Sequence, residues 1–214
     1  VIELLRAIRG PHTQLELAHR LDRDTSGCLL IAKRPAALRA LHAQFRDGTV
    51  DNRYLALLMG RWPGRARTVD APLLTDERRG GERHVRVDAA GKEASTRFVP
   101  LERFPDAVLA EVHLTTGRTH QIRVHAASIG HPVAGDERNG VADDPIVAGH
   151  GLKRLFLHAR SLAFRSPATD QLISVEAPLG EDLTAPLDRL RTDVGALRVV
   201  AADTASVRRV GPSS

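Results

Sequence analysis

The densest group of ionisable side chains is the stretch from His19 to Gly27, which reads His-Arg-Leu-Asp-Arg-Asp-Thr-Ser-Gly. Residues 15–18 before it and 28–32 after it have apolar patterns that are typical of short strands. A charged loop between two strands is a common place for a scaffold to present catalytic groups. Residues 24–27 are also common turn formers, so half of the stretch has a purely structural interpretation.

Asp22 is the better catalytic candidate of the two aspartates in this stretch. Asp24 precedes Thr-Ser-Gly and fits a turn, whereas Asp22 lies between Leu21 and Arg23. An ionised aspartate can attack an anomeric carbon or accept a proton, as carboxylates in glycosidases do. An arginine partner would favour the ionised form, and the basic segment near residue 119 could supply one.

A second dense stretch runs from Thr116 to His125 and reads Thr-Gly-Arg-Thr-His-Gln-Ile-Arg-Val-His. Thr119 is a suitable N-cap for a helix that reaches Ser128. Arg118 would lie just outside this helix and Arg123 about one turn inside it. The free N–H groups of the first turn could bind a phosphate or a carboxylate from elsewhere in the chain. A solvated basic helix face is the alternative interpretation.

Other kinds of catalytic centre have little support. His120 and His125 are five residues apart, about 140° around a helix, so they do not share a face as metal ligands would. No His-Glu-x-x-His motif and no phosphate-cradling Gly-x-x-x-x-Gly-Lys loop occurs. Ser26 lacks the Gly-x-Ser-x-Gly setting of a nucleophile. Cys28, the single cysteine, excludes a disulfide within the chain and a four-cysteine zinc site.

Composition points weakly toward nucleic acid. The 214 residues carry a net charge of +5, and only Lys33, Lys92 and Lys153 of the 31 basic residues are lysines. Arginine offers a planar fork that suits phosphates and bases. Aromatic residues make up only 3%, which argues against a broad base-stacking platform. No apolar run approaches the ~18 residues that cross a bilayer, so we expect no membrane association.

Hydrophobic periodicity predicts an α+β domain. It indicates helices over residues 1–9, 35–47, 119–128 and 183–190. It indicates strands over residues 54–59, 95–101, 107–114, 155–164 and 172–177. Residues 64–93 are expected to form hairpins and mobile loops, residues 135–151 a long loop, and the residues from 201 onward a frayed tail. Most strands follow one another through turns, which favours a largely antiparallel sheet.

Three blocks of the sequence resemble the RluA family of pseudouridine synthases. They are His19 to Gly27, Arg53 to Leu57 and Thr116 to His125, in the order of the family, with weaker similarity at Gly130-His131-Pro132 and at Leu155 to Ala159. The resemblance covers residues 1–192 and is strongest to members that modify large-subunit (23S) ribosomal RNA. It implies the pseudouridine synthase catalytic fold, an α+β fold with a largely antiparallel mixed sheet, flanking helices and an RNA-binding cleft.

The resemblance implies the site residues and the reaction. Asp22 would be the catalytic aspartate, and Arg123 would pair with it. Tyr54, the only tyrosine of the chain, would stack on a flipped uracil and help to remove the proton from its C5. Arg20 would enter the gap that the flipped nucleotide leaves in the RNA stack. The reaction would move the ribose C1′ bond from N1 to C5 of the uracil, with no metal and no cofactor. Whether Asp22 attacks C1′ or takes the 2′ proton stays open.

The resemblance also implies the remaining RNA contacts and the context of the domain. The further RNA-binding residues are expected to be Arg118, His120 and Gln121. We expect a catalytic domain over residues 1–192 and a flexible extension over 193–214. The strand that usually precedes the first helix, and the S4-type domain further upstream, are absent from this sequence, so we expect a fragment with reduced affinity for RNA. We also expect a monomer located in the cytoplasm.

Three alternatives stay open. The chain could bind RNA without turnover, or it could act on tRNA instead of ribosomal RNA. It could also be a glycosidase or nucleosidase, with Asp136 or Glu137 as the second carboxylate that such chemistry needs.

Overall fold

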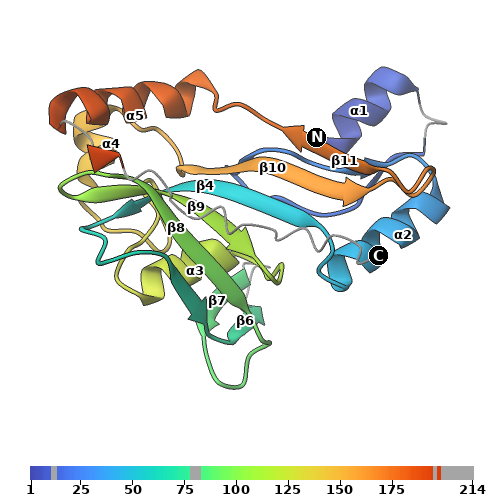
Figure 1. Cartoon of the computed structure of the whole chain (residues 1–214), viewed down its shortest axis with the longest axis horizontal. Coiled ribbons are helices and arrows are strands. Elements are labelled where there is room, and N and C mark those ends of the chain that lie inside the picture. The colour runs from blue at the N-terminus through green and yellow to red at the C-terminus, as the bar shows by residue number, and fades with distance from the viewer. Residues whose placement is uncertain (11–13, 78–82, 195–196, 199–214) are drawn as a thin grey trace, which may run out of the picture.

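A central sheet organises the computed structural model, which describes residues 1–10, 14–77, 83–194 and 197–198. Its strands are β2 (Ser26–Gly27), β4 (Asp51–Met59), β5 (Arg67–Asp70), β8 (Ser95–Arg103), β9 (Ala107–Leu114), β10 (Leu157–Arg165), β11 (Leu172–Glu176) and β12 (Leu197–Arg198). Within the described residues the order is β11-β10-β4-β9-β8-β12, with β2 added to β10 and β5 added to β8 (Figure 1). The pairing of β2 with β10 is parallel and the other pairings of this sheet are antiparallel. The predicted α+β class and largely antiparallel sheet are therefore confirmed.

Two small strand pairs and several helices surround the sheet. Two-stranded antiparallel sheets pair β1 (Glu16–Leu17) with β3 (Ile31–Ala32) and β6 (Leu73–Glu77) with β7 (Arg83–Val87), of which only the second pair is consecutive in the chain. The helices are α1 (Ile2–Arg9), α2 (Pro35–Arg46), α3 (Gln121–Ser128), α4 (Pro145–His150) and α5 (Glu181–Val194). Helices α1 and α2 lie at one end of the long sheet, and α4 and α5 lie at the other end (Figure 1).

Strand β4 is the centre of the core and is buried on both faces from Tyr54 onward. Because side chains alternate across a strand, Tyr54, Ala56 and Leu58 join one core, which also includes apolar residues of α3. Leu57 and Met59 join a second core against α4 and α5. Each fully buried apolar side chain of this size contributes about 1.5–3 kcal/mol. This alternation also decides that Tyr54 lies on the α3 side of the sheet.

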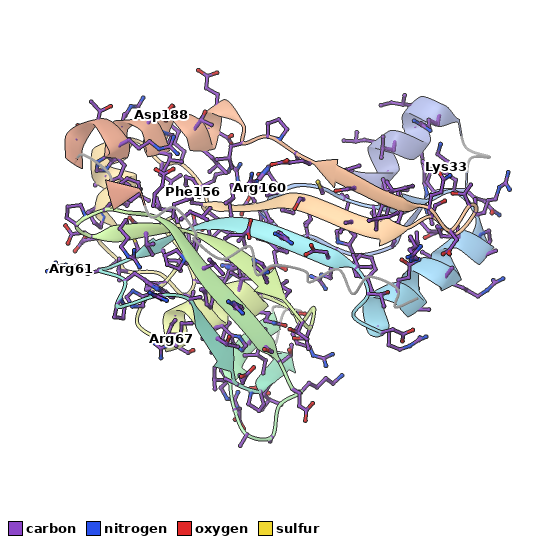
Figure 2. All side chains as sticks on the ribbon, in the orientation of Figure 1. Lys33, Arg61, Arg67, Phe156, Arg160 and Asp188 are labelled. Carbon is purple, nitrogen blue, oxygen red and sulfur yellow. The ribbon has the colours of Figure 1, made fainter. Side chains whose placement is uncertain are left out.

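The second core packs helix α5 against the sheet. Leu183 and Leu187 of α5 are 0% and 1% exposed and pack in one cluster with Phe156, which is also fully buried. Phe156 lies just before β10, between the sheet and α5 (Figure 2). Helix α5 is thereby joined to the strand that anchors the site described below.

Local geometry differs from the sequence predictions in three places. The expected loop over 135–151 contains α4, because the Asp144 side chain accepts hydrogen bonds from the N–H groups of Ile146 and Val147 and Pro145 occupies the first turn. Helix α3 begins at Gln121 instead of following a Thr119 N-cap, since the residue between them has a left-handed backbone. The strands expected on either side of the 19–27 stretch are shorter than predicted.

The predicted C-terminal extension is described only in part. Helix α5 continues to Val194, past the predicted boundary at residue 192, and β12 pairs with β8. Residues 195–196 and 199–214, including the predicted tail from residue 201, lie outside the described residues.

Candidate active site

Asp22 begins a tight turn in the connection between β1 and β2. The backbone N–H of Thr25 donates to the carbonyl oxygen of Asp22 at 3.1 Å, and Asp24 has a left-handed backbone with φ 67°. Aspartate visits this conformation more readily than most residues do. Asp22 itself is half-buried and lines a cleft. The turn-forming residues therefore have a structural task, which is to present Asp22.

Gly27 fixes this turn to the centre of the sheet. Strand β2 lies parallel to β10, with Gly27 opposite Ala159, and the N–H of Cys28 donates to the carbonyl oxygen of Ala159 at 2.8 Å. Gly27 has φ 110°, and a Cβ at this position would lie 2.2 Å from that carbonyl oxygen. Only glycine permits so close an approach with this backbone conformation.

Tyr54 reaches the same region from β4. It is 7% exposed, and its phenol oxygen accepts a hydrogen bond from the Asn52 side-chain amide at 3.0 Å. Burial and the negative charge of Asp22 raise the pKa of Tyr54 to about 12, although the Asn52 hydrogen bond opposes the rise. Tyr54 is therefore a neutral phenol at neutral pH, held in place by a neighbour on its own strand.

One cleft brings most of the predicted site residues together. It is lined by Arg20, Asp22, Tyr54, Arg118 and Gln121, with apolar walls that include Ile122 of α3. Arg20 and Arg118 are exposed there. The Arg20 guanidinium has no hydrogen-bond or ion-pair partner among the residues that the structure describes. The Arg118 side chain donates to the carbonyl oxygen of Glu93 at 3.0 Å.

Arg123 does not make the contact that was predicted for it. Its Nε and Nη2 donate to the two carboxylate oxygens of Asp136 at 2.8 and 2.5 Å, and the Asp136 side chain is fully buried. No hydrogen bond or ion pair links Arg123 with Asp22, although both are described residues. The fork of a guanidinium is satisfied best by a bidentate carboxylate. The loop after Gly135 supplies that carboxylate from within the core.

Asp22 nevertheless acts on Arg123 through its charge, and on His120 as well. Burial lowers the pKa of Arg123, but Asp136, Asp22 and Asp24 outweigh it and raise the value overall. Burial lowers the pKa of His120 below its ordinary value, and the charge of Asp22 only partly offsets this. The structure thus brings residues 22, 54, 120 and 123 into one electrostatic neighbourhood. His120 and Arg123 are not among the described residues that line the cleft.

The stretch 116–125 divides into a buried side and an exposed side. Gln121 is 2% exposed, and its amide group donates to the Ser95 carbonyl and the Thr96 hydroxyl. Its side-chain oxygen accepts from the Thr116 hydroxyl and from the backbone N–H of Arg118. These four bonds use the whole hydrogen-bonding capacity of the side chain. Gln121 therefore shapes the loop before α3, and the direct RNA contact expected of it has no free polar group to make it.

His125 is also part of this buried side. The ring is fully buried, with Nδ1 2.8 Å from the Thr96 hydroxyl oxygen and Nε2 2.9 Å from the carbonyl oxygen of Ala71. The exposed side of the stretch carries Arg118, and His120 is half-buried beside it. The basic motif is thus bound into the protein on one side and accessible at Arg118 on the other.

Among the described residues, no cluster of three or more histidine, cysteine, aspartate or glutamate side chains could hold a metal ion. None of the helices formed by those residues is both long enough and apolar enough to span a membrane.

The fold and the sequence together define the class of protein. Residues 9–128 match the family described as RNA pseudouridylate synthase, which is more than half of the chain, and the chain therefore belongs to that family. A solved structure titled Human RNA Pseudouridylate Synthase Domain Containing 1 superimposes with a TM-score of 0.70 at 26% identity, covering 89% of this chain and 84% of that one.

Curated relatives are more similar still. The ribosomal large subunit pseudouridine synthase C of Vibrio vulnificus (strain CMCP6) is 50% identical over 192 residues, which cover 89% of this chain and 60% of the relative. The protein of the same name from Escherichia coli (strain K12) is 49% identical over 194 residues, or 89% of this chain and 61% of the relative. The chain thus spans about three fifths of the length of these relatives.

Several residues that shape the site were not identified from the sequence. Asp136 was considered only as a second carboxylate for a glycosidase, and its pairing with Arg123 has no local signal. Asn52 lies two residues before Tyr54, so strand alternation places both side chains on one face and could have indicated the contact. Arg154 donates to the Asp24 carbonyl oxygen and His158 is hydrogen-bonded to Ser26, but no sequence pattern links either residue to the 19–27 stretch.

Proposed function

We propose that this chain isomerises uridine to pseudouridine in RNA, with large-subunit ribosomal RNA as its substrate. The observation that carries the proposal is the cleft in which the half-buried carboxylate of Asp22 and the ring of Tyr54 lie together beside two exposed arginines. The names of the similar relatives support the choice of ribosomal RNA. No metal or cofactor takes part in the proposed reaction, and we propose a monomer that works in the cytoplasm.

Asp22 acts at the ribose of the target nucleotide. The bond between N1 of uracil and C1′ breaks, either because the carboxylate attacks C1′ or because it takes the 2′ proton. The freed uracil turns within the cleft, C5 joins C1′, and the proton on C5 leaves to a base. The charge of Asp22 also acts on the buried guanidinium of Arg123, whose fork is bound to Asp136.

Tyr54 contributes a stacking surface and a proton acceptor. With its pKa at about 12, the phenol is protonated at neutral pH. It can therefore take the C5 proton only while its own proton passes to a base, and the Asp22 carboxylate, which lines the same cleft and acts on the phenol through its charge, is the acceptor. Asn52 donates to the phenol oxygen, so the phenolic hydrogen points away from Asn52 and is free for that transfer. Stacking of a base on one aromatic ring contributes about 1–3 kcal/mol.

The arginines allow the nucleotide to leave the RNA helix. Extrusion of a base costs a few kcal/mol in lost stacking and pairing. The exposed guanidinium of Arg20 can enter the gap in the stack, because its planar group stacks on bases. Arg118 and His120 contact phosphates near the mouth of the cleft.

Release of tritium from C5 of uracil tests the proposal. Ribosomal RNA transcribed with 5-tritiated uridine should lose tritium to water when it is incubated with the protein. Asp22→Asn keeps the size of the side chain and should abolish release while RNA affinity stays within about threefold of wild type, because phosphate contacts dominate affinity. Asp51→Asn is the matched control, since Asp51 is exposed and pairs with Arg53 on the surface; its release should equal that of wild type.

Two results would contradict the proposal. Folded wild-type protein that binds the RNA but releases no tritium would be an RNA-binding module without turnover. Release of tritium from tRNA and none from ribosomal RNA would support the proposed reaction but contradict ribosomal RNA as the substrate.

A further inference from the structure

Arg154 lies beside the turn that presents Asp22 and has no part in the reaction described above. Its Nη1 donates to the carbonyl oxygen of Asp24 at 3.0 Å, and its Nη2 donates to the Ser26 hydroxyl at 2.9 Å. Its Nε donates to the carboxylate of Asp182 near the start of α5. A single guanidinium therefore binds the far end of the turn on one side and helix α5 on the other.

Ser26 extends this contact into the core through His158, which is 2% exposed. The His158 Nε2 lies 2.9 Å from the carbonyl oxygen of Ala177. A carbonyl oxygen only accepts, so Nε2 carries the hydrogen, and in the neutral ring Nδ1 accepts. The Ser26 hydroxyl then donates to Nδ1 at 2.8 Å, and its oxygen is left to accept from Arg154. With the ring neutral, the direction of each of these bonds is defined, and Nη1 of Arg154 also donates to the carbonyl oxygen of Leu155 at 3.2 Å.

We propose that Arg154 is a positioning residue that holds Asp22 in its reactive place by clamping the turn of residues 22–25. The proposal rests on the proposed function, because it assigns Asp22 to the chemistry. Arg154 does not touch the Asp22 carboxylate. It acts through the Asp24 carbonyl and through the Thr25 N–H, which donates to the carbonyl oxygen of Asp22 at 3.1 Å.

The turn needs such a clamp because of its backbone. Asp24 has φ 67°, a conformation that L-residues leave readily unless contacts hold them in it. Rotation of Asp24 to a right-handed conformation would redirect its carbonyl and break the turn bond of Thr25. The Asp22 side chain would then no longer be fixed relative to Tyr54 across the cleft.

The guanidinium suits this task better than an ammonium would. Arginine presents several N–H donors in a fixed fork, so it can bind the Asp24 carbonyl and the Ser26 hydroxyl together with the Asp182 carboxylate. A lysine has one flexible nitrogen and can satisfy only part of this set. Arg154→Lys should therefore restore some, but not all, of what a neutral substitution removes.

Single-turnover kinetics test the proposal. Arg154→Gln should lower the rate of tritium release at saturating RNA by about 10- to 100-fold, because a displacement of ~1 Å in a catalytic group costs about 100-fold. The dissociation constant for RNA should stay within about threefold of the control. Arg154→Lys should recover part of the rate. Arg160→Gln is the control, since it removes a charge of the same sign from β10 (Figure 2) and breaks only the contacts of that side chain with Glu176 and Glu111.

A second measurement does not depend on activity. Hydrogen exchange of the Thr25 amide reports its bond to the Asp22 carbonyl directly. Exchange of this amide should be at least about tenfold faster in Arg154→Gln than in Arg160→Gln, because the clamp that holds the turn is lost. A general loss of stability would instead raise the exchange rates of the amides of the buried strand β4 by the same factor.

Each outcome decides for or against the proposal. A saturated rate for Arg154→Gln within twofold of the Arg160→Gln rate would overturn it, whatever happens to the melting temperature. An unchanged saturated rate with weaker RNA binding would make Arg154 an RNA contact instead. If wild type releases no tritium, the proposed function fails, and the exchange of the Thr25 amide still decides whether Arg154 holds the turn.

Discussion

Replacement of Asp136 by asparagine should destabilise the domain strongly, although Asp136 is outside the cleft. The Asp136 carboxylate accepts from Arg123 and from the backbone N–H groups of Arg138 and Asn139, at distances from 2.5 to 3.1 Å. The side chains of Asp136 and Arg123 are 0% and 8% exposed. Asparagine keeps the size and one acceptor oxygen, but it leaves the buried Arg123 charge without the carboxylate that it binds directly.

The size of the effect follows from this burial. Removal of one partner of a buried ion pair costs about 3–5 kcal/mol. The exposed pair of Asp51 and Arg53 is a matched control, and loss of such a pair costs about 0–1 kcal/mol. A domain of 150–250 residues loses about 2–4 °C of melting temperature per kcal/mol. Asp136→Asn should therefore melt about 6–20 °C below wild type, and Asp51→Asn less than about 4 °C below it.

The difference between Asp136→Asn and wild type should also depend on pH. Burial raises the pKa of Asp136, but the hydrogen bonds from Arg123, Arg138 and Asn139 outweigh it and leave the pKa below its ordinary value. A carboxyl group with a lowered pKa stabilises the folded state above the pKa of the unfolded chain, about 3.9, and this contribution is lost as the pH falls through the folded value. The difference in melting temperature should therefore narrow below about pH 4.

Urea unfolding at pH 7 and thermal melts from pH 7 to pH 3 measure both effects. A free energy of unfolding for Asp136→Asn within about 1 kcal/mol of wild type at pH 7 would refute the assignment of a buried, paired charge. So would a difference in melting temperature that stays constant down to pH 3.

Two further predictions concern the cleft and its anchor. Tyr54→Phe keeps the ring and loses the hydroxyl. The single-turnover rate of tritium release should therefore fall by about 10²–10⁴-fold, the range for a general base, while RNA affinity is retained. An unchanged rate would mean that another group takes the C5 proton. Gly27→Ala should lower the free energy of unfolding by about 2–6 kcal/mol in urea, because its Cβ would meet the Ala159 carbonyl in addition to the strain at φ 110°. Gly48→Ala is the control, because Gly48 has φ 68° with open space around the new Cβ and only the backbone strain applies; it should lower the free energy of unfolding by less. Equal losses of free energy in the two variants would contradict the close approach at Gly27.

The sequence predicted much of the local structure correctly. The strands 95–101, 107–114 and 172–177 and the helices 1–9 and 35–47 lie within about two residues of the observed elements, which is the usual uncertainty of element ends. These patterns depend on neighbours in the chain, and the continuous buried run along β4 from Tyr54 to Met59 is one of them. Helix α4 also had a local signal, Asp144 followed by Pro145, which the absence of hydrophobic periodicity obscured.

The partners of the charged groups depend on the tertiary structure and not on the local sequence. The motifs that resemble a family predicted Asp22, Tyr54 and Arg123 as catalytic residues, and the structure brings Asp22 and Tyr54 into one cleft. The resemblance gave Arg123 the wrong partner, since a side chain can bind only what lies on the face that its helix presents after packing. His120, with φ 52° at the start of α3, helps to set which way that helix turns its side chains.

Residue types and their spacing along the chain therefore determined which groups could do chemistry and which elements would carry them. The assembled sheet decided that Arg123 binds Asp136, that Gln121 is used up inside the protein, and that Arg154 reaches the turn of Asp22. The physical reason is the range of the interactions. Strand and helix formation responds to residues a few positions apart, whereas a hydrogen bond across 130 positions, such as that from Arg154 to Asp24, exists only once the cores on both faces of the sheet have packed.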